Sequence, residues 1–338
     1  MNDTASVTGS APSLAGLAGI LEAGGPGLAA LLLRAEKRLA EVAGGHGETL
    51  GAPAARTLNA GGKRLRPALV FLCAGSGRSE ALVSAGVAVE LVHMATLVHD
   101  DVLDRAALRR GQPTVFSTGG RTAATATGDL LFSRAFAELA GTGNEEAVAV
   151  LSQASSALAR GELMQRGDAF SASVGLERYL ERCRLKTGHL FEAACRLGAI
   201  LGTPGSGAAA ALGSFGSRIG LAFQILDDVL DVSGPAERTG KRPGADLLDG
   251  TVTMPLILAR QADPALAGVD LRALPGAEAG EVAALCERIA ATGALAASRR
   301  RALEEVARAK EALGQVNLGA EQREALELVA DGVVERYA

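Results

Sequence analysis

Residues 79–109 read SEALVSAGVAVELVHMATLVHDDVLDRAALR and carry the longest helical pattern in the chain. Apolar residues dominate this stretch, and the period-two runs of Val, Ile, Thr and aromatic residues that indicate strands are hard to find. Glu90 and His93 interrupt its most apolar window, Ala81 to Val98, so no charge-free window long enough to span a membrane occurs there. The stretch therefore predicts a buried helix over 79–109 that carries an acidic motif, HDDVLD at 99–104, near its end.

The composition of the whole chain favours the same fold class. The chain has 338 residues, of which 48% are hydrophobic and only 3% aromatic, so it is long and apolar enough for a large core. We therefore expect one large all-α helical bundle of about ten or more helices. Further helical patterns lie at Leu28–Val42, Pro67–Ala74, Gly128–Ala140, Asn144–Ala159, Glu177–Gly202, Gly207–Val232, Thr251–Arg260, Glu278–Ala291 and Glu321–Arg336.

Charge and cysteine content exclude several classes of protein. A balance of 34 basic against 38 acidic residues argues against a nucleic-acid-binding protein, which needs a basic surface. The four cysteines form no CxxC pair, which predicts buried thiols in a reducing compartment. The first basic residue is Arg34, so the Ser-, Gly- and Ala-rich start lacks the charged region of a signal peptide. We expect a cytoplasmic protein with a mobile tail at 1–25, one domain at 26–338 and no transmembrane segment.

A second acidic motif, QILDDVLD at 224–231, repeats the DDxxD pattern of the first. In each motif the first and last aspartates lie four residues apart on one helix face, about 6 Å apart along the axis. Their repulsion costs roughly a few tenths of a kcal/mol per pair in an isolated helix. A solvated acidic helix end is the simpler explanation of one such motif. Two copies in apolar helices indicate Mg²⁺, which binds carboxylates together with substrate phosphates, and predict that both motifs hold one diphosphate.

Basic residues cluster at motifs that suit a phosphate-bearing substrate. GGKRLRP at 61–67 places two glycines and three cations directly before a helix, and glycines allow close backbone approach. Arg109 and Arg110 follow the first acidic motif, Lys186 lies in a helical segment and Lys241 in a long connector. Each cation alone is typical of a solvated surface. Together they predict that one substrate is held through metal and another directly by cations.

These motifs resemble those of the trans-isoprenyl diphosphate synthases, or polyprenyl synthetases, from about Arg34 to Arg336. The matching motifs are GGKRLRP at 61–67, HDDVLD at 99–104, RRGQPT at 109–114, GDLLFSRAF at 128–136, GELMQ at 161–165, KTG at 186–188 and FQILDDVLD at 223–231. The resemblance implies an all-α fold of the isoprenoid synthase type around a deep central cavity, usually as a homodimer. It also implies a reaction between isopentenyl diphosphate and an allylic diphosphate.

The resemblance implies a role for each motif residue. The allylic diphosphate is expected to bind through three Mg²⁺ ions to Asp100, Asp104 and Asp227, with Asp101, Asp228 and Asp231 supporting them or binding through water. The cations implied for this diphosphate are Arg109, Lys186 and Lys241. The residues implied for isopentenyl diphosphate are Lys63, Arg66, His93 and Arg110, and the polar groups implied near the reacting carbon are Gln224 and Thr187.

The implied chemistry needs no nucleophilic side chain. Metal and cations stabilise the departing diphosphate, the allylic C–O bond ionises, and the double bond of isopentenyl diphosphate attacks the cation. Asp100, Asp101, Asp104, Lys186, Thr187, Gln224, Asp227 and Asp228 are expected to carry this reaction. The sequence departs from many family members at Thr251, which occupies the position of a lysine that binds diphosphate.

The residues before the first motif bear on product length. Ala95 and Thr96 are small where short-chain members carry a bulky aromatic residue, which predicts a product longer than farnesyl diphosphate. Another helix can instead close the pocket, with Phe132, Phe136 and Leu163 as candidates. The primer can be dimethylallyl, geranyl or farnesyl diphosphate. A terpene cyclase and a non-catalytic subunit of a heteromeric synthase are the alternatives, disfavoured by the GGKRLRP cluster and by two whole acidic motifs.

Overall fold

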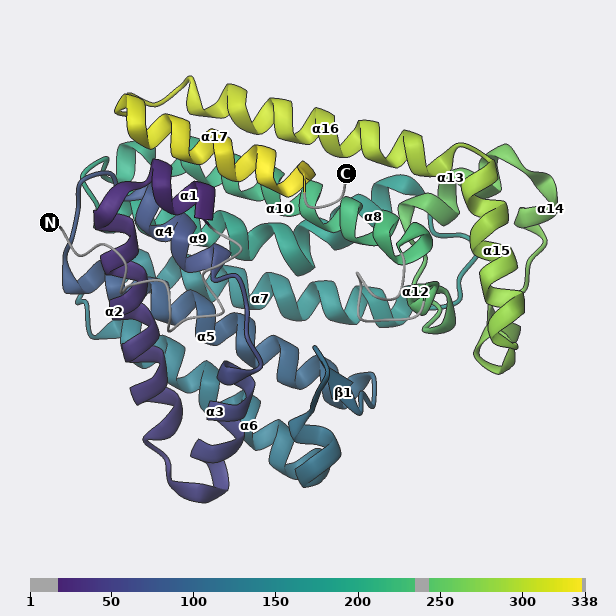
Figure 1. Cartoon of the computed structure of the whole chain (residues 1–338), viewed down its shortest axis with the longest axis horizontal. Coiled ribbons are helices and arrows are strands. Elements are labelled where there is room, and N and C mark those ends of the chain that lie inside the picture. The colour runs from purple at the N-terminus through teal and green to yellow at the C-terminus, as the bar shows by residue number, and fades with distance from the viewer. Residues whose placement is uncertain (1–17, 235–242, 336–338) are drawn as a thin grey trace, which may run out of the picture. The chain divides into compact units, whose positions relative to one another are not determined.

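The computed structural model describes residues 18–234 and 243–335, and within these ranges it is almost entirely helical (Figure 1). The all-α prediction is therefore confirmed. Strands in the described part of the chain are limited to the two-residue pair β1 (Leu108–Arg109) and β2 (Gln112–Pro113). Of the tail expected at 1–25, residues 1–17 lie outside the described residues, and Ala18–Ala23 form helix α1.

The contacts within the chain group its residues into two compact units. The first unit takes in residues up to 148 together with 197–206 and 318–328, and the second takes in the remainder. The helical elements between residues 18 and 168, all of which begin in the first unit, are α1, α2 (Gly25–Gly44), the π-helical turn η2 (Gly47–Gly51), α3 (Ala52–Asn59), α4 (Leu65–Cys73), α5 (Glu80–Leu103), α6 (Val115–Ala140) and α7 (Glu145–Asp168).

Helix α5 is the core of the first unit. Ser79 caps its first turn by accepting a hydrogen bond from the Leu82 amide at 3.4 Å, as expected for a Ser at this position. The helix packs most extensively against α6 and also contacts α2 and α4. Most of its apolar side chains are buried, which explains why the sequence is apolar on every face.

Two predicted helix boundaries in this unit were wrong. The helix expected to run to Arg109 ends at Leu103, because Arg105 has a left-handed backbone with φ 50° and the β1–β2 hairpin follows. Helix α6 begins at Val115 rather than Gly128, and the Thr114 side chain caps it. A non-helical residue, Gly120, kinks this helix and interrupts its periodicity, so the first half carries no clear helical pattern.

The second unit contains most of the remaining elements. They are α8 (Leu176–Cys183), the π-helical turn η3 (Arg184–Gly188), α9 (His189–Leu201), α10 (Ser206–Ser233), α12 (Ala245–Leu248), α13 (Met254–Ala262), α14 (Pro264–Ala267), the 3₁₀ turn η4 (Leu271–Gly276), α15 (Ala279–Ala291), α16 (Ala294–Leu313) and α17 (Ala320–Glu335). Helices α7, α9, α10 and α17 have residues in both units. Helices α1, α3, α12, α14 and α16 were not predicted.

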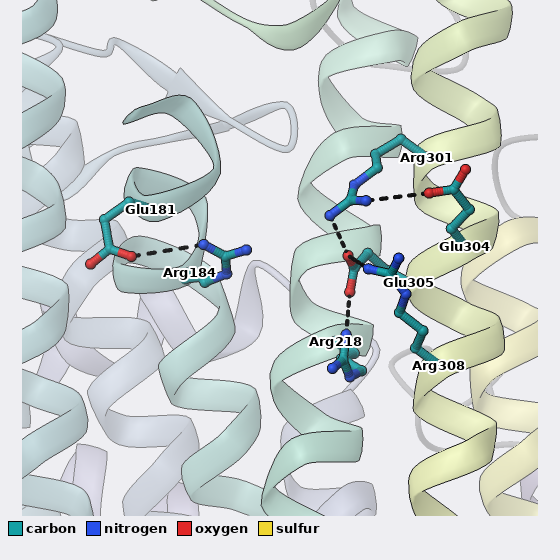
Figure 2. A network of polar contacts seen from close by, with 7 residues as sticks. All are labelled: Glu181, Arg184, Arg218, Arg301, Glu304, Glu305 and Arg308. Atoms are coloured by element: carbon teal, nitrogen blue, oxygen red, sulfur yellow. Dashed lines mark hydrogen bonds and ion pairs between the residues drawn. The ribbon is translucent and has the colours of Figure 1, made fainter. Parts of the chain in front are cut away.

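Helix α10, which carries the second acidic motif, is tied to α16 by a buried carboxylate. Glu305 is 2% exposed and accepts from Arg218 at 2.9 Å, Arg301 at 2.7 Å and Arg308 at 3.4 Å. Figure 2 shows these guanidinium groups converging on it from the two helices. Because a buried charge without a partner is strongly unfavourable, this cluster fixes the position of α10 against α16.

Two helices, Glu80–Leu103 and Gly207–Ser233, are long and apolar enough to cross a membrane by length and composition alone. The most apolar windows of these helices are 72% and 61% buried inside the protein. Their apolar character is thus accounted for by packing within the two units.

Candidate active site

The first acidic motif lies at the end of α5, and its three aspartates have different environments. Asp101 is 5% exposed, and its Oδ1 accepts a hydrogen bond from Arg109 Nε at 2.8 Å. Asp100 is half-buried, and Asp104 is exposed at the C-cap of the helix. The middle aspartate therefore ties the helix to the hairpin, while the outer two present accessible oxygens on one face.

The β1–β2 hairpin positions two of the predicted cations. Arg110 and Gly111 form its turn with φ of 52° and 75°, the left-handed pair that a tight two-residue hairpin requires. This turn places Arg109 on the strand beside Asp101 and leaves Arg110 exposed. Arg109, expected as a contact of the allylic diphosphate, is thus a partner of the first motif.

The predicted residues for isopentenyl diphosphate gather in the first unit. Burial, followed by the charges of Arg66 and Arg110, lowers the pKa of His93 well below its ordinary value, so the imidazole is neutral at physiological pH. Burial also lowers the pKa of Arg66, to about 10, which leaves this side chain charged. Lys63 is exposed on the loop just before α4. The structure therefore brings the guanidinium groups of Arg66 and Arg110 close enough to the His93 imidazole to act on it electrostatically.

The residues expected to set product length differ in accessibility. Ala95 is fully buried, so its side chain is packed against protein, whereas Thr96 is half-buried and donates from Oγ1 to the His93 carbonyl at 2.7 Å. Phe132 on α6 stacks on His99, with ring centroids 5.8 Å apart. Leu163 is 74% exposed. Thr96 lies one helical turn before the first motif, Phe132 contacts its His99, and both are half-buried.

The second acidic motif, on α10, likewise has a buried middle aspartate and two more accessible outer ones. Asp228 is 4% exposed and accepts from the Tyr179 hydroxyl at 2.7 Å and from Gln224 Nε2 at 2.8 Å. Asp227 is exposed and Asp231 half-buried. Because burial is the largest influence on it, the pKa of Asp228 is raised to about 7. The middle aspartate of this motif is therefore held by neutral donors.

One other predicted residue of the second unit, Thr187, joins this network. Thr187 donates from Oγ1 to Gln224 Oε1 at 2.7 Å, which extends the chain of hydrogen bonds from Asp228. Lys186 and Thr187 both lie on the π-helical turn η3, an irregularity frequent at functional sites. The Lys186 ammonium donates to Glu162 Oε2 at 2.5 Å. Lys241 lies outside the described residues.

Glu162 lies in the GELMQ segment and determines how Lys186 is held. Burial acts to raise the pKa of Glu162, but Lys186 and then Arg166 outweigh burial, so the pKa is lowered and the group stays charged. A Cβ at Gly161 would lie 2.7 Å from the Lys186 amide nitrogen. Glycine at this position therefore lets α7 approach the π-helical turn.

The segment at Thr251 is rigidly placed despite the missing lysine. Gly250 has φ of 72°, and the Thr251 amide donates to the Asp246 carbonyl at 2.8 Å. The next residue, Val252, accepts from buried Arg182 at 2.6 Å. Thr251 itself is half-buried and contributes a hydroxyl in place of an ammonium group.

Four residues of this site were missed by sequence reasoning. Glu90 was noticed only as an interruption of an apolar run, although a charge in a buried helix must have a partner. Glu162 lies within a recognised motif without an assigned role. Arg64 was counted among the cations of the 61–67 motif without an assigned role. Tyr179 has no signal in the sequence, because a lone aromatic residue in an amphipathic helix is usually a core residue.

Two surface hollows of about 370 and 330 Å³ lie in the second unit. The first is lined by α7 and α9, and the second mainly by η3, α9, α10 and α16. Neither is lined by an aspartate of the two acidic motifs.

Comparison with known proteins places the chain in a family. A family model described as polyprenyl synthetase matches residues 47–288. The chain belongs to the polyprenyl synthetase family. The heptaprenyl diphosphate synthase component 2 of Geobacillus stearothermophilus is 41% identical over 251 residues, which cover 73% of this chain and 77% of that protein. As a polyprenyl synthetase, the chain is a prenyl-transferring enzyme that elongates isoprenyl diphosphates.

Solved structures of other polyprenyl synthetases share the fold. The decaprenyl diphosphate synthase of Rhodobacter capsulatus has a TM-score of 0.85 and 34% identity, and the match covers 92% of this chain and 97% of that one. The polyprenyl synthase of Caulobacter crescentus CB15, complexed with calcium and isoprenyl diphosphate, has a TM-score of 0.85 and 33% identity, with 96% and 98% covered. The isoprenoid synthase fold expected from the motifs is thereby confirmed.

Proposed function

We propose that this chain condenses isopentenyl diphosphate with an allylic diphosphate and makes a linear all-trans polyprenyl diphosphate of geranylgeranyl length or longer, in a reaction that depends on Mg²⁺. The observation that carries the proposal is the shared design of the two DDxxD motifs. In each, a buried middle aspartate is held by protein donors and two outer aspartates are more accessible. An acidic surface needs no such division, whereas a metal site does.

The donor set fits Mg²⁺. Asp100, Asp104 and Asp227 offer carboxylate oxygens, which hard divalent cations prefer. Within residues 18–234 and 243–335, no group of three or more His, Cys, Asp or Glu side chains forms a metal cage. Mg²⁺ is commonly bound by one or two carboxylates with waters and substrate phosphates, so a cage is not expected. The Caulobacter relative, solved with calcium and isoprenyl diphosphate, supports a divalent cation beside this substrate class.

The remaining residues supply charge and orientation. When bound, Mg²⁺ would neutralise the charge that develops on the departing diphosphate. Lys186, oriented by Glu162, adds a point charge for the same purpose. Gln224 and Thr187, linked by their hydrogen bond, present a fixed amide and hydroxyl to the reacting carbon. After ionisation and attack by the isopentenyl double bond, a proton is lost to the released diphosphate and an alkene is restored.

Product length is proposed from accessible small residues near the first motif. Thr96 adds little bulk at the position where a side chain would close the bottom of the hydrocarbon pocket, and it is more accessible than Ala95. The relatives named for heptaprenyl and decaprenyl products support a long chain. We therefore favour a product longer than farnesyl diphosphate. Phe132 is the alternative residue that would close the hydrocarbon pocket.

The chain is proposed to act as a homodimer. The Geobacillus relative is named as a component, which favours a heteromeric enzyme as the second candidate. In that case this chain would be the catalytic partner, because both its acidic motifs are whole.

The test is incubation of the purified chain with isopentenyl diphosphate, Mg²⁺ and dimethylallyl, geranyl or farnesyl diphosphate, with products sized by mass spectrometry. We expect a product of geranylgeranyl length or longer from at least one primer. A product that stops at farnesyl diphosphate would contradict the proposed length but not the reaction. Absence of product from every primer, with a folded chain and after addition of candidate partner subunits, would contradict the proposed reaction.

A further inference from the structure

The loop between α3 and α4 has an unusual backbone at Arg64. Gly61 has φ of 85°, and Arg64 has φ of 49° and ψ of 34°, in the left-handed region that non-glycine residues rarely adopt. Such a conformation persists only where the surrounding structure imposes it. The two left-handed residues flank Gly62 and Lys63, so the backbone at Arg64 determines the course of the loop that carries Lys63 into α4.

The Arg64 side chain is held by three separate segments. Its Nη1 donates to Glu90 Oε1 on α5 at 3.0 Å, and its Nε donates to Glu36 on α2. Its Nη2 donates to the Leu58 carbonyl at the end of α3 at 3.2 Å. The side chains of Arg64 and Glu90 are each 4% exposed. Arg64 is thus bound by protein oxygens at each of its nitrogens.

The same acids balance a crowded group of cations. A Cβ at Gly62 would lie 2.9 Å from Arg64 Nη1 and 3.2 Å from Arg110 Nη1, so the loop packs directly against both guanidinium groups. Glu90 also acts on Arg66, where its negative charge opposes the effect of burial on the pKa. Since like charges repel strongly when partly buried, the group needs a buried acid to stay assembled.

We infer that Arg64 and Glu90, assisted by Glu36, are positioning residues that hold the 61–66 loop in the conformation that binds the diphosphate of isopentenyl diphosphate. This inference rests on the proposed function. Arg64 acts through its neighbours, because its own donors are directed to Glu90, Glu36 and Leu58. Lys63 and Arg66, on either side of it, are the groups that meet the substrate.

The inference predicts a selective loss of affinity. Glu90→Gln keeps the shape and one acceptor but removes the charge that Arg64 and Arg66 share. Losing one charge-assisted contact should weaken isopentenyl diphosphate binding by about tenfold. The KM for the allylic diphosphate should change by less than about twofold, because that substrate is assigned to other residues. Glu36→Gln, at a more exposed position, should also weaken isopentenyl diphosphate binding, but by less than Glu90→Gln.

The experiment combines calorimetric binding of isopentenyl diphosphate to the full chain with KM and kcat for both substrates. Glu138→Gln is the matched control: Glu138 has a 3% exposed side chain and pairs with Arg38 and Arg134 in the same unit. Thermal unfolding of each variant shows whether it is folded. If Glu90→Gln does not fold, Glu36→Gln decides the question with the same measurements.

Three results would overturn the inference. The first is wild-type affinity for isopentenyl diphosphate in the folded Glu90→Gln or Glu36→Gln variant. The second is an equal loss of affinity for both substrates. The third is an equal loss in Glu138→Gln, which would show a general effect of breaking a buried ion pair. A wild-type chain that makes no product contradicts the proposed function instead, and is recognised before any variant is made.

Discussion

Replacing Asp228 with asparagine should remove a pH dependence from the stability of the metal-free protein. Asparagine has nearly the same shape as aspartate, and its carbonyl oxygen still accepts from Gln224. The Tyr179 hydroxyl, which donates to Asp228 at 2.7 Å, can rotate to accept from the new amide. Asp228→Asn therefore removes the titrating charge and keeps both hydrogen bonds.

The magnitude follows from the raised pKa of Asp228, about 7 against an ordinary value of 3.8. Between these values the folded protein holds a proton that the unfolded chain has released, so stability falls as the pH rises. At about 1.36 kcal/mol per pKa unit, the full effect is up to about 4 kcal/mol. Between pH 5 and pH 8 the wild type should lose about 3 kcal/mol more than Asp228→Asn.

The assay is urea denaturation at pH 5 and pH 8, with chelator present to remove divalent cations. The variant should be more stable than the wild type at pH 8, and this advantage should shrink at pH 5. Asp104→Asn, at an exposed aspartate of the other motif, is the matched control for removal of one carboxylate. Identical pH dependence of wild type and Asp228→Asn would refute a raised pKa at this buried carboxyl.

Three further predictions concern the scaffold, the metal ligands and product length. Glu305→Gln leaves three guanidinium groups without their shared charge and should lower the free energy of unfolding by about 3 kcal/mol in urea denaturation; a loss below about 1 kcal/mol would contradict its role in fixing α10. Asp100→Ala and Asp227→Ala should each reduce turnover by about a hundredfold or more with unchanged circular dichroism; activity near that of the wild type with Mg²⁺ present would contradict the metal assignment. Thr96→Phe should shorten the product seen by mass spectrometry, whereas fully buried Ala95→Phe should mainly cost about 1–3 kcal/mol of stability; an unchanged product from Thr96→Phe would move the floor elsewhere.

Helices with strongly apolar faces were predictable from sequence, and those that bury small or polar residues were not. Helix α5 was recognised because nearly all of its length is apolar. Helix α16 was missed because its sequence is rich in Arg and Glu, and its buried positions include Ser298, Ala302 and Glu305. The residue that decides its packing, Glu305, reads as a surface charge until its partner Arg218 is brought to it from 87 residues away.

The sequence also does not show which distant residues contact the two acidic motifs. These contacts differ between two motifs that look alike in sequence. The spacing of DDxxD places the outer aspartates on one helix face wherever it occurs. The partners of the middle aspartate come from elsewhere: Asp101 meets a cation eight residues on, and Asp228 meets the neutral hydroxyl of Tyr179 from 49 residues away. A cationic partner favours the charged carboxylate, whereas neutral donors in a buried position do not offset desolvation fully. The raised pKa of Asp228 therefore follows from the partners that the fold brings to it and not from the motif alone.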